Sequence, residues 1–194
     1  MDRPLARRRP RHRREDSGTS LNPPLNGDVF INYRESDSHS YGALLYLALV
    51  HRFGSARVFL DSESIPAGAD YAAELLSRVR RARVLLAVIG PDWLSCAGAG
   101  GGRRLDDPDD WVRRELATAF DAGVRVIPVL TDEATLPGEQ ELPTDIAALS
   151  RCQYRRLRPR DAVADLARLV ADIAPATLLL PSANTTCEAN ALPF

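Results

Sequence analysis

The sequence predicts an α/β fold in which a parallel β-sheet carries helices on both faces. Three observations lead to this prediction. Short apolar runs alternate with segments of helical spacing through most of the 194 residues, as in parallel sheets joined by crossover helices. The runs at 83–90 and 124–130 are almost continuous Val, Ile and Leu, which is typical of strands covered on both faces. The length suits one domain with a substantial core.

Five strands are expected, each followed by a helical segment. The predicted strands are Asp28 to Tyr33, Arg57 to Leu60, Arg83 to Gly90, Val124 to Leu130 and a weaker Gln153 to Leu157. Between and after them, apolar residues recur at intervals of three and four, which indicates amphipathic helices. These residues are Ala43, Leu44, Leu47, Ala48 and Val50; Ala72, Leu75, Leu76 and Val79; Leu116, Ala119 and Phe120; and Leu166, Leu169, Val170 and Ile173. A short helix is also predicted from Pro143 to Leu149.

The two ends of the chain differ from its centre. Seven of the 25 basic residues lie in residues 1–16, a run without interleaved aromatic residues or a helical period. We therefore expect a disordered Arg-rich tail over residues 1–26 and no nucleic-acid binding. After about residue 174 the hydrophobic period is lost again. The prediction is a domain over 27–174 and a C-terminal tail over 175–194.

Composition excludes several kinds of chemistry. Every basic residue except the histidines is Arg, so no Lys is present for a Walker-A phosphate loop or a pyridoxal Schiff base. Arg stays protonated and cannot replace a neutral amine. The cysteines Cys96, Cys152 and Cys187 are isolated from each other, so no metal site or disulfide framework is predicted and a cytoplasmic location is expected. No apolar run is long enough to span a membrane.

Five motifs follow one another along the chain: Asp28-Val29-Phe30-Ile31-Asn32-Tyr33-Arg34; Val58-Phe59-Leu60-Asp61 with the loop Ser62-Glu63-Ser64-Ile65-Pro66-Ala67-Gly68; Ile89-Gly90-Pro91-Asp92-Trp93-Leu94; Asp110-Trp111-Val112-Arg113-Arg114-Glu115-Leu116; and Val126-Ile127-Pro128-Val129. Their order and spacing resemble those of the Toll/interleukin-1 receptor (TIR) family. The first strand matches the family's opening string D-x-F-[IL]-S-[YF], except that Asn32 stands where Ser is commoner. The motif around Glu115 matches W-x-x-x-E-[LIV], which is found in TIR enzymes.

The resemblance implies a flavodoxin-like, five-stranded parallel sheet with helices on both faces, the TIR fold. It also implies an NAD glycohydrolase that cleaves the nicotinamide–ribose bond and releases ADP-ribose or a cyclic ADP-ribose. NAD would be the substrate, with no further cofactor. Family members of this compact form act in bacterial signalling and antiphage defence, and homotypic TIR–TIR association or another protein partner often controls their activity.

Glu115 is the residue that the resemblance makes catalytic. Nicotinamide leaves as a neutral heterocycle, so the reaction needs chiefly a negative charge beside the positive ribose carbon of the transition state. Trp111 lies four residues before Glu115 and therefore on the same helix face, where its indole offers a surface for a nucleotide base. The competing interpretation is structural: a partly buried Trp beside a solvated Glu that pairs with Arg.

Further substrate contacts are expected at the end of the first strand and in the loop after the second. Tyr33, Arg34 and Glu35 end the first strand, and Arg34 is a candidate to bind the pyrophosphate; the alternative is a surface Arg. Glu35 stands where some family members carry a second Arg, which weakens that assignment. Ile65 lies in the loop that lines the substrate site in the family. Asp109 and Asp110 are interpreted as helix caps, and the Gly-rich segment 95–109 as a flexible insertion.

Two other functions remain open from the sequence. A non-catalytic TIR scaffold would act only by homotypic association, but scaffold members often lack the Trp–Glu pair seen at Trp111 and Glu115. A nucleoside deoxyribosyltransferase-like enzyme would share the fold and a catalytic Glu. The TIR signature in the first strand argues against that second alternative.

Overall fold

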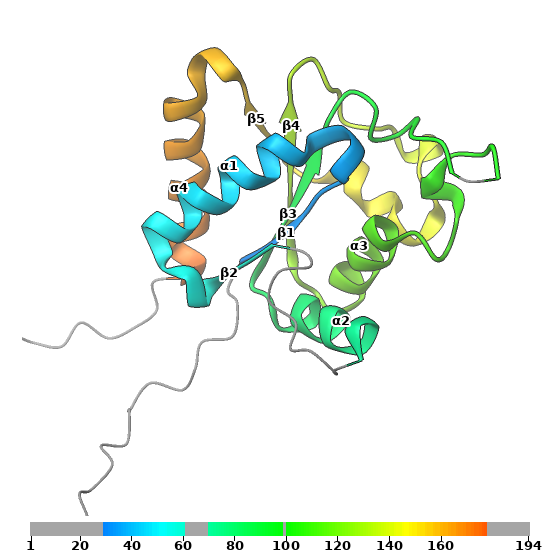
Figure 1. Cartoon of the computed structure of the whole chain (residues 1–194), viewed down its shortest axis with the longest axis horizontal. Helices are drawn as coiled ribbons and strands as arrows, with labels where there is room; N and C mark the ends of the chain where they lie inside the picture. The colour runs from blue at the N-terminus through cyan, green and yellow to red at the C-terminus, as the bar shows by residue number, and fades with distance from the viewer. Residues whose placement is uncertain (1–28, 61–69, 99, 178–194) are drawn as a thin grey trace, which may run out of the picture.

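A computed structural model describes residues 29–60, 70–98 and 100–177 and contains the five parallel strands that the sequence predicts. The strands are β1 (Val29–Asn32), β2 (Val58–Leu60), β3 (Val84–Ile89), β4 (Arg125–Thr131) and β5 (Arg155–Leu157). They form one sheet in the order β2-β1-β3-β4-β5, seen almost edge-on in Figure 1. The order is that of flavodoxin-like folds, whose ligands bind where the strand order reverses, between β1 and β3.

In the part of the chain that the structure describes, four α-helices and five short 3₁₀ helices connect and cover the strands. The α-helices are α1 (Glu35–Phe53), α2 (Tyr71–Arg81), α3 (Trp111–Asp121) and α4 (Ala162–Thr177), and the 3₁₀ helices are η1 (Ser55–Arg57), η2 (Arg104–Asp106), η3 (Glu139–Glu141), η4 (Thr144–Arg151) and η5 (Pro159–Asp161). The short helix predicted at 143–149 is therefore present, but it is a 3₁₀ helix. Helix α4 continues three residues past the predicted domain boundary at 174. The two terminal segments, 1–28 and 178–194, lie outside the described residues.

The core has two halves, one on each face of the sheet. On one face, α2, α3 and η4 contribute Leu75, Leu116 and Ile146, together with inward-facing residues of the strands. On the other face, Leu45 of α1 and Leu169 of α4 pack against the alternate strand residues. Burial on both faces explains the continuous apolar composition of β3, in which all six residues are buried.

Alternation along β1 decides which side chains can meet at the carboxyl end of the sheet. Val29 and Ile31 pack in the half of the core that contains α1 and α4, whereas Phe30 packs in the half that contains α2 and α3. Because successive side chains of a strand point to opposite faces, Asn32 faces α3 and Tyr33 faces α1. The strand therefore sends two neighbouring polar residues to different sides of the sheet.

Helices α2 and α3 begin at aspartate caps. Asp70 accepts a hydrogen bond from the backbone N–H of Ala73 and caps α2. Asp110 accepts one from the backbone N–H of Arg113, at 3.1 Å, and caps α3. Such caps satisfy N–H groups that have no partner inside the helix. The prediction that Asp110 caps this helix is confirmed.

The Gly-rich segment before α3 is more ordered than an irregular insertion. Ala97 and Arg103 form an antiparallel bridge. The backbone N–H of Gly98 donates to the carbonyl of Gly102 at 2.7 Å, and that of Arg104 to the carbonyl of Cys96 at 2.8 Å. Gly101, at φ 84°, makes the turn that a side chain would oppose. The described part of this segment is therefore a short hairpin-like turn rather than the flexible insertion expected from its glycines.

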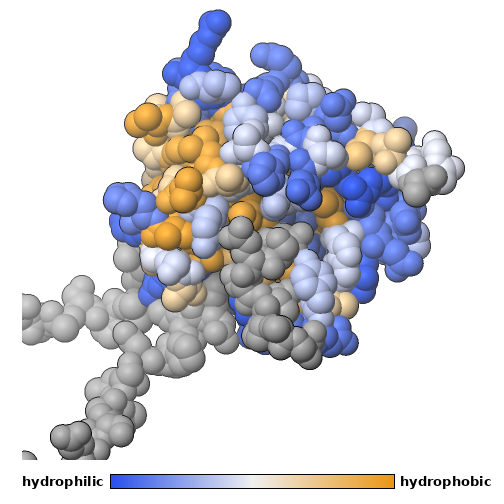
Figure 2. All heavy atoms as spheres, viewed as in Figure 1, coloured by the Kyte–Doolittle hydropathy of each residue, from blue (hydrophilic) through white to orange (hydrophobic). Residues whose placement is uncertain are grey.

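Apolar side chains gather on the outer surface of two helices. Figure 2 shows them in orange over the part of this face where α1 and α4 lie. The exposed large hydrophobic residues of these two helices are Leu44 and Leu47 of α1, 38% and 66% exposed, and Val163 at the start of α4, 85% exposed. Within the described chain, no helix combines the length and apolar character needed to cross a bilayer.

Candidate active site

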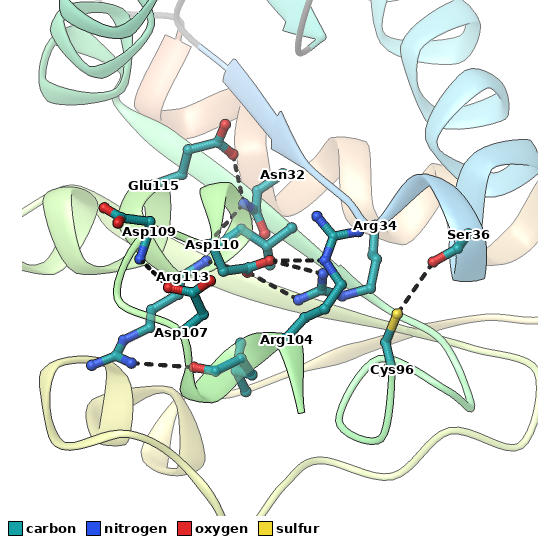
Figure 3. A network of polar contacts seen from close by, with 12 residues as sticks. Asn32, Arg34, Ser36, Cys96, Arg104, Asp107, Asp109, Asp110, Arg113 and Glu115 are labelled. Carbon is teal, nitrogen blue, oxygen red and sulfur yellow. Dashed lines mark hydrogen bonds and ion pairs between the residues drawn. The ribbon is translucent and has the colours of Figure 1, made fainter. Parts of the chain in front are cut away.

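Glu115 lies inside the protein, at the carboxyl end of β1. It is on the second turn of α3 and its side chain is almost fully buried, with 2% of the residue exposed. Its Oε2 atom accepts a hydrogen bond from Nδ2 of Asn32 at 2.6 Å, as Figure 3 shows. A carboxylate is rarely buried without a partner or a functional reason. The interpretation of Glu115 as a solvated surface residue is therefore wrong.

Asn32 is the side chain of β1 that reaches α3. It is 0% exposed and its Nδ2 donates both to Glu115 and, at 3.2 Å, to the backbone carbonyl of Val112. Asn32 was not among the residues predicted for the site. The alternation of side chains along β1 could have identified Asn32, because a polar residue on the same face as Phe30 must lie against a buried helix.

Arg34 is neither a surface residue nor a free phosphate ligand. It is 2% exposed, and its Nη1 and Nη2 atoms each lie 3.0 Å from one carboxylate oxygen of Asp110. This paired geometry occupies the face of the guanidinium that would otherwise grip a phosphate. The expected pyrophosphate contact therefore does not fit this structure, and Arg34 instead joins the end of β1 to the start of α3 (Figure 3).

A second arginine adds charge beside this pair. Nε of Arg104 lies 3.4 Å from the carboxylate of Asp110, and the Arg104 side chain is 46% exposed. Two cations therefore share one buried carboxylate. Arg104, Asp110 and Trp111 line an open cleft of about 580 Å³ whose other wall is the Gly-rich turn.

Trp111, the first residue of α3, is half-buried and its indole already has two neighbours. The ring of Tyr71, the first residue of α2, meets it edge-on at a centroid distance of 5.6 Å. The guanidinium of Arg114 lies over the indole, 4.3 Å from the ring centre. A base that stacked on that face would have to displace Arg114, and the Arg side chain is long enough to move.

Three predicted contact residues remain, and two of them, Tyr33 and Glu35, lie in the described part of the chain. Tyr33 is half-buried on the α1 side of β1, where a Cβ on Gly42 would lie 3.1 Å from its ring. Its side chain is thus on the opposite face of the strand from Glu115. Glu35 is exposed on the first turn of α1. Ile65 falls in the segment 61–69, outside the described residues.

The turn after β3 is fixed by a carboxylate from α1. Asp37 accepts hydrogen bonds from the backbone N–H groups of Gly90, at 2.9 Å, and Asp92, at 2.8 Å. A Cβ on Gly90 would lie 2.4 Å from Oδ2 of Asp37, so the approach requires glycine. The first turn of α1 is thereby held against the turn after β3, at the reversal point of the sheet.

The fold and this site together define a class of protein: a flavodoxin-like domain with a buried carboxylate at the carboxyl edge of its central strands. The family model described as the TIR domain matches residues 29–170. The chain belongs to the TIR domain family. Among the described residues, no group of three or more His, Cys, Asp or Glu side chains is arranged to hold a metal ion.

Curated relatives of this chain include three animal proteins. The chain is 32% identical over 125 residues to "NAD(+) hydrolase sarm1" of Drosophila melanogaster, which covers 63% of this chain and 8% of the relative. It is 31% identical over 127 residues to "NAD(+) hydrolase tir-1" of Caenorhabditis elegans, covering 64% and 12%. It is 32% identical over 127 residues to "NAD(+) hydrolase SARM1" of Danio rerio, covering 65% and 16%. The chain thus spans less than a fifth of the length of each relative.

A solved structure with the same fold is that of the TIR domains in the activated Roq1 resistosome directly recognizing the pathogen effector XopQ. The superposition has a TM-score of 0.57 and 15% sequence identity, and it covers 76% of this chain and 99% of that one. At this identity the likeness concerns the fold, and it agrees with the five-stranded parallel sheet described above.

Proposed function

We propose that the chain is an NAD hydrolase that cleaves the nicotinamide–ribose bond, with Glu115 as its catalytic residue. The observation that carries the proposal is the position of Glu115, 2% exposed at the carboxyl end of β1 and held by Asn32. Relatives named NAD(+) hydrolases align over about two thirds of this chain. Ligands of open α/β sheets bind at this edge.

The reaction follows from the charge that Glu115 brings. As the bond between ribose C1′ and the nicotinamide nitrogen breaks, its electron pair neutralises the pyridinium, and positive charge develops on the ribose. A carboxylate shielded from water stabilises that charge more strongly than one in solvent. Water then adds to C1′ and loses a proton, which gives ADP-ribose. Addition of a nucleophile from the same molecule would give a cyclic ADP-ribose instead.

Trp111 and the segment around it are proposed to seat the substrate. The indole lies one helical turn before Glu115 and beside the cleft of about 580 Å³. Ile65 and the backbone that follows β1, at Tyr33 and Glu35, belong to the same proposal as contacts to NAD. Arg34 is not proposed to bind NAD, because Asp110 already occupies both terminal nitrogens of its guanidinium.

Nicotinamide release from NAD tests this function. We expect the wild-type chain to release nicotinamide and Glu115→Gln, which has the same shape without the charge, to lose at least about 100-fold in kcat. Glu139→Gln is the matched control, because Glu139 is 61% exposed and pairs with Arg151 on the surface. Equal rates for wild type and Glu115→Gln, both folded by circular dichroism, would remove Glu115 from its role.

Self-association through the apolar surface of α1 and α4 is the second part of the proposal. Leu47 and Val163 expose apolar area on these two helices, which no described part of the chain covers. A second copy of the domain would bury that area. A wild type that binds NAD but does not cleave it would favour the scaffold function, with association as its whole activity. Both functions, NAD cleavage and scaffolding, are compatible with the role in cytoplasmic signalling or defence that the family resemblance suggests.

A further inference from the structure

The amide of Asn32 is constrained on both sides by α3. Its Nδ2 atom donates to Oε2 of Glu115 at 2.6 Å and to the carbonyl of Val112 at 3.2 Å. Both partners are acceptors, so only the NH₂ group of the amide fits between them. The reversed amide would place an oxygen against a carbonyl and a carboxylate. The hydrogen-bond network therefore fixes the orientation of this side chain.

An Asn at position 32 is unfavourable for the stability of the folded protein. The other residues of β1, Val29 to Ile31, are apolar and buried. The Oδ1 atom of Asn32 is itself buried and has no hydrogen-bond partner among the described residues. An unsatisfied buried acceptor destabilises the folded protein. Residues of this kind are found where function, rather than stability, decides the side chain.

We infer that Asn32 is a positioning residue for Glu115, whose side chain it holds in one orientation before the substrate arrives. A charge-assisted hydrogen bond favours the carboxylate over the neutral acid. It also limits rotation of a side chain that otherwise has three free torsions, so less order has to be created in the transition state. The inference rests on the proposed cleavage of NAD and adds a residue to it.

Three variants of Asn32 separate positioning from folding. Asn32→Ala removes the donor and should lower kcat by about 10- to 100-fold with little change in KM, the range for a hydrogen bond to a charged group. Asn32→Ser keeps one donor on a shorter side chain and should fall between wild type and Asn32→Ala. Asn32→Asp places a second carboxylate beside Glu115, which should move the acid limb of the pH–rate profile to higher pH.

Thr131→Val is the matched control. Thr131 is also fully buried at the carboxyl end of a strand of the same sheet, β4, where its Oγ1 donates to the carbonyl of Ile89 at 3.4 Å. This variant should change thermal stability but not the pH–rate profile. An Asn32→Asp enzyme with the wild-type profile and kcat would overturn the inference. So would a loss in Asn32→Ala that is matched by Thr131→Val at equal stability.

A second readout keeps this test separate from that of the proposed function. The carboxyl carbon of Glu115 can be followed by NMR through a pH titration in wild type and Asn32→Asp. The inference predicts that its ionisation moves to higher pH in the variant, whether or not NAD is cleaved. If wild type releases no nicotinamide, the proposed function fails. An unchanged titration of Glu115 would instead reject the role of Asn32.

Discussion

Arg34 and Asp110 form a buried ion pair between the end of β1 and the start of α3. Each terminal nitrogen of the guanidinium lies 3.0 Å from one carboxylate oxygen, and the two side chains are 1% and 2% exposed. Asp110 also caps the helix through the N–H of Arg113. One carboxylate therefore sets both where α3 begins and how it sits against the sheet, and so determines the position of Glu115 one turn later.

Removing the charge of Asp110 should therefore be costly. Asp110→Asn keeps a capping oxygen but leaves the charge of Arg34 buried, and we expect a loss of about 3–5 kcal/mol in the free energy of unfolding. Chemical denaturation measures it. The exposed pair of Arg151 and Glu139, 66% and 61% exposed, is the control, and Arg151→Met should cost less than about 1 kcal/mol. Similar losses for the two variants would contradict the role given to Asp110.

Replacing Gly90 by a larger residue should destabilise the turn after β3. In Gly90→Ala the new Cβ would meet Oδ2 of Asp37 at 2.4 Å, so the carboxylate must move and its bonds to the N–H groups of the turn are lost. We expect a decrease of about 1–3 kcal/mol in the free energy of unfolding. Gly100→Ala is the control, because nothing lies within 4 Å of a Cβ there. A Gly90→Ala protein as stable as the control would show that the turn adapts.

Trp111 should affect substrate binding more than the chemical step. Stacking of a base on an aromatic ring contributes about 1–3 kcal/mol, so we expect Trp111→Ala to raise KM for NAD by roughly 5- to 100-fold. Trp111→Phe keeps an aromatic face and should show a smaller increase. Steady-state kinetics of nicotinamide release give both constants. An unchanged KM in folded Trp111→Ala would show that the base binds elsewhere.

Leu47 tests the proposed association. A charge on this 66% exposed side chain should oppose burial against a second copy, and Leu47→Glu should weaken association by about 10-fold or more. Light scattering over a range of concentrations measures the oligomeric state. Thr135→Glu adds the same charge at an exposed position between β4 and η3 and should have no effect. Equal association of both variants would show that the interface does not include Leu47 of α1.

Much of the fold follows from the sequence because burial leaves a periodic pattern. The runs that became β3 and β4 are apolar on both faces, and the helical spacing of Leu75 and Val79 marks the buried side of α2. The segment at 143–149 is too short for its spacing to separate an α-helix from the 3₁₀ helix η4. Its first hydrogen bond runs from the N–H of Ile146 to the carbonyl of Pro143, three residues back.

The site was predictable only where its residues lie close in the sequence. Trp111 and Glu115 share a helical turn, so their spacing was sufficient to pair them. Asn32 and Glu115 are 83 residues apart, and their contact depends on the strand order and on the direction in which α3 crosses β1. For Arg34, the sequence suggested a pyrophosphate contact or a surface position. Only its partner Asp110, 76 residues away, explains why it is buried.

Asp165 should make stability depend on pH. It accepts hydrogen bonds from the backbone N–H and guanidinium of Arg158 and from Arg168. The side-chain bond from Arg158 is the main cause that holds the pKa of Asp165 far below its usual range, against the opposing effect of burial. A carboxyl whose pKa is depressed in the folded state stabilises the protein above its unfolded pKa of about 4, and this contribution is lost as the pH falls through the folded value.

Replacing Asp165 should therefore matter at neutral pH and progressively less in acid. At pH 7 we expect Asp165→Asn to lose about 1.5–3 kcal/mol in the free energy of unfolding, the range for hydrogen bonds to a charged group. Below about pH 4 the difference from wild type should shrink, since Asp165 of the unfolded chain then takes up a proton while that of the folded chain stays ionised, which favours unfolding of the wild type. Asp161→Asn is the control, because Asp161 is 53% exposed and lies 3.5 Å from the same Arg158; it should cost less than about 1 kcal/mol at any pH. A difference for Asp165→Asn that stays constant from pH 7 to pH 3 would mean that packing, and not the ionised carboxylate, ties η5 to α4.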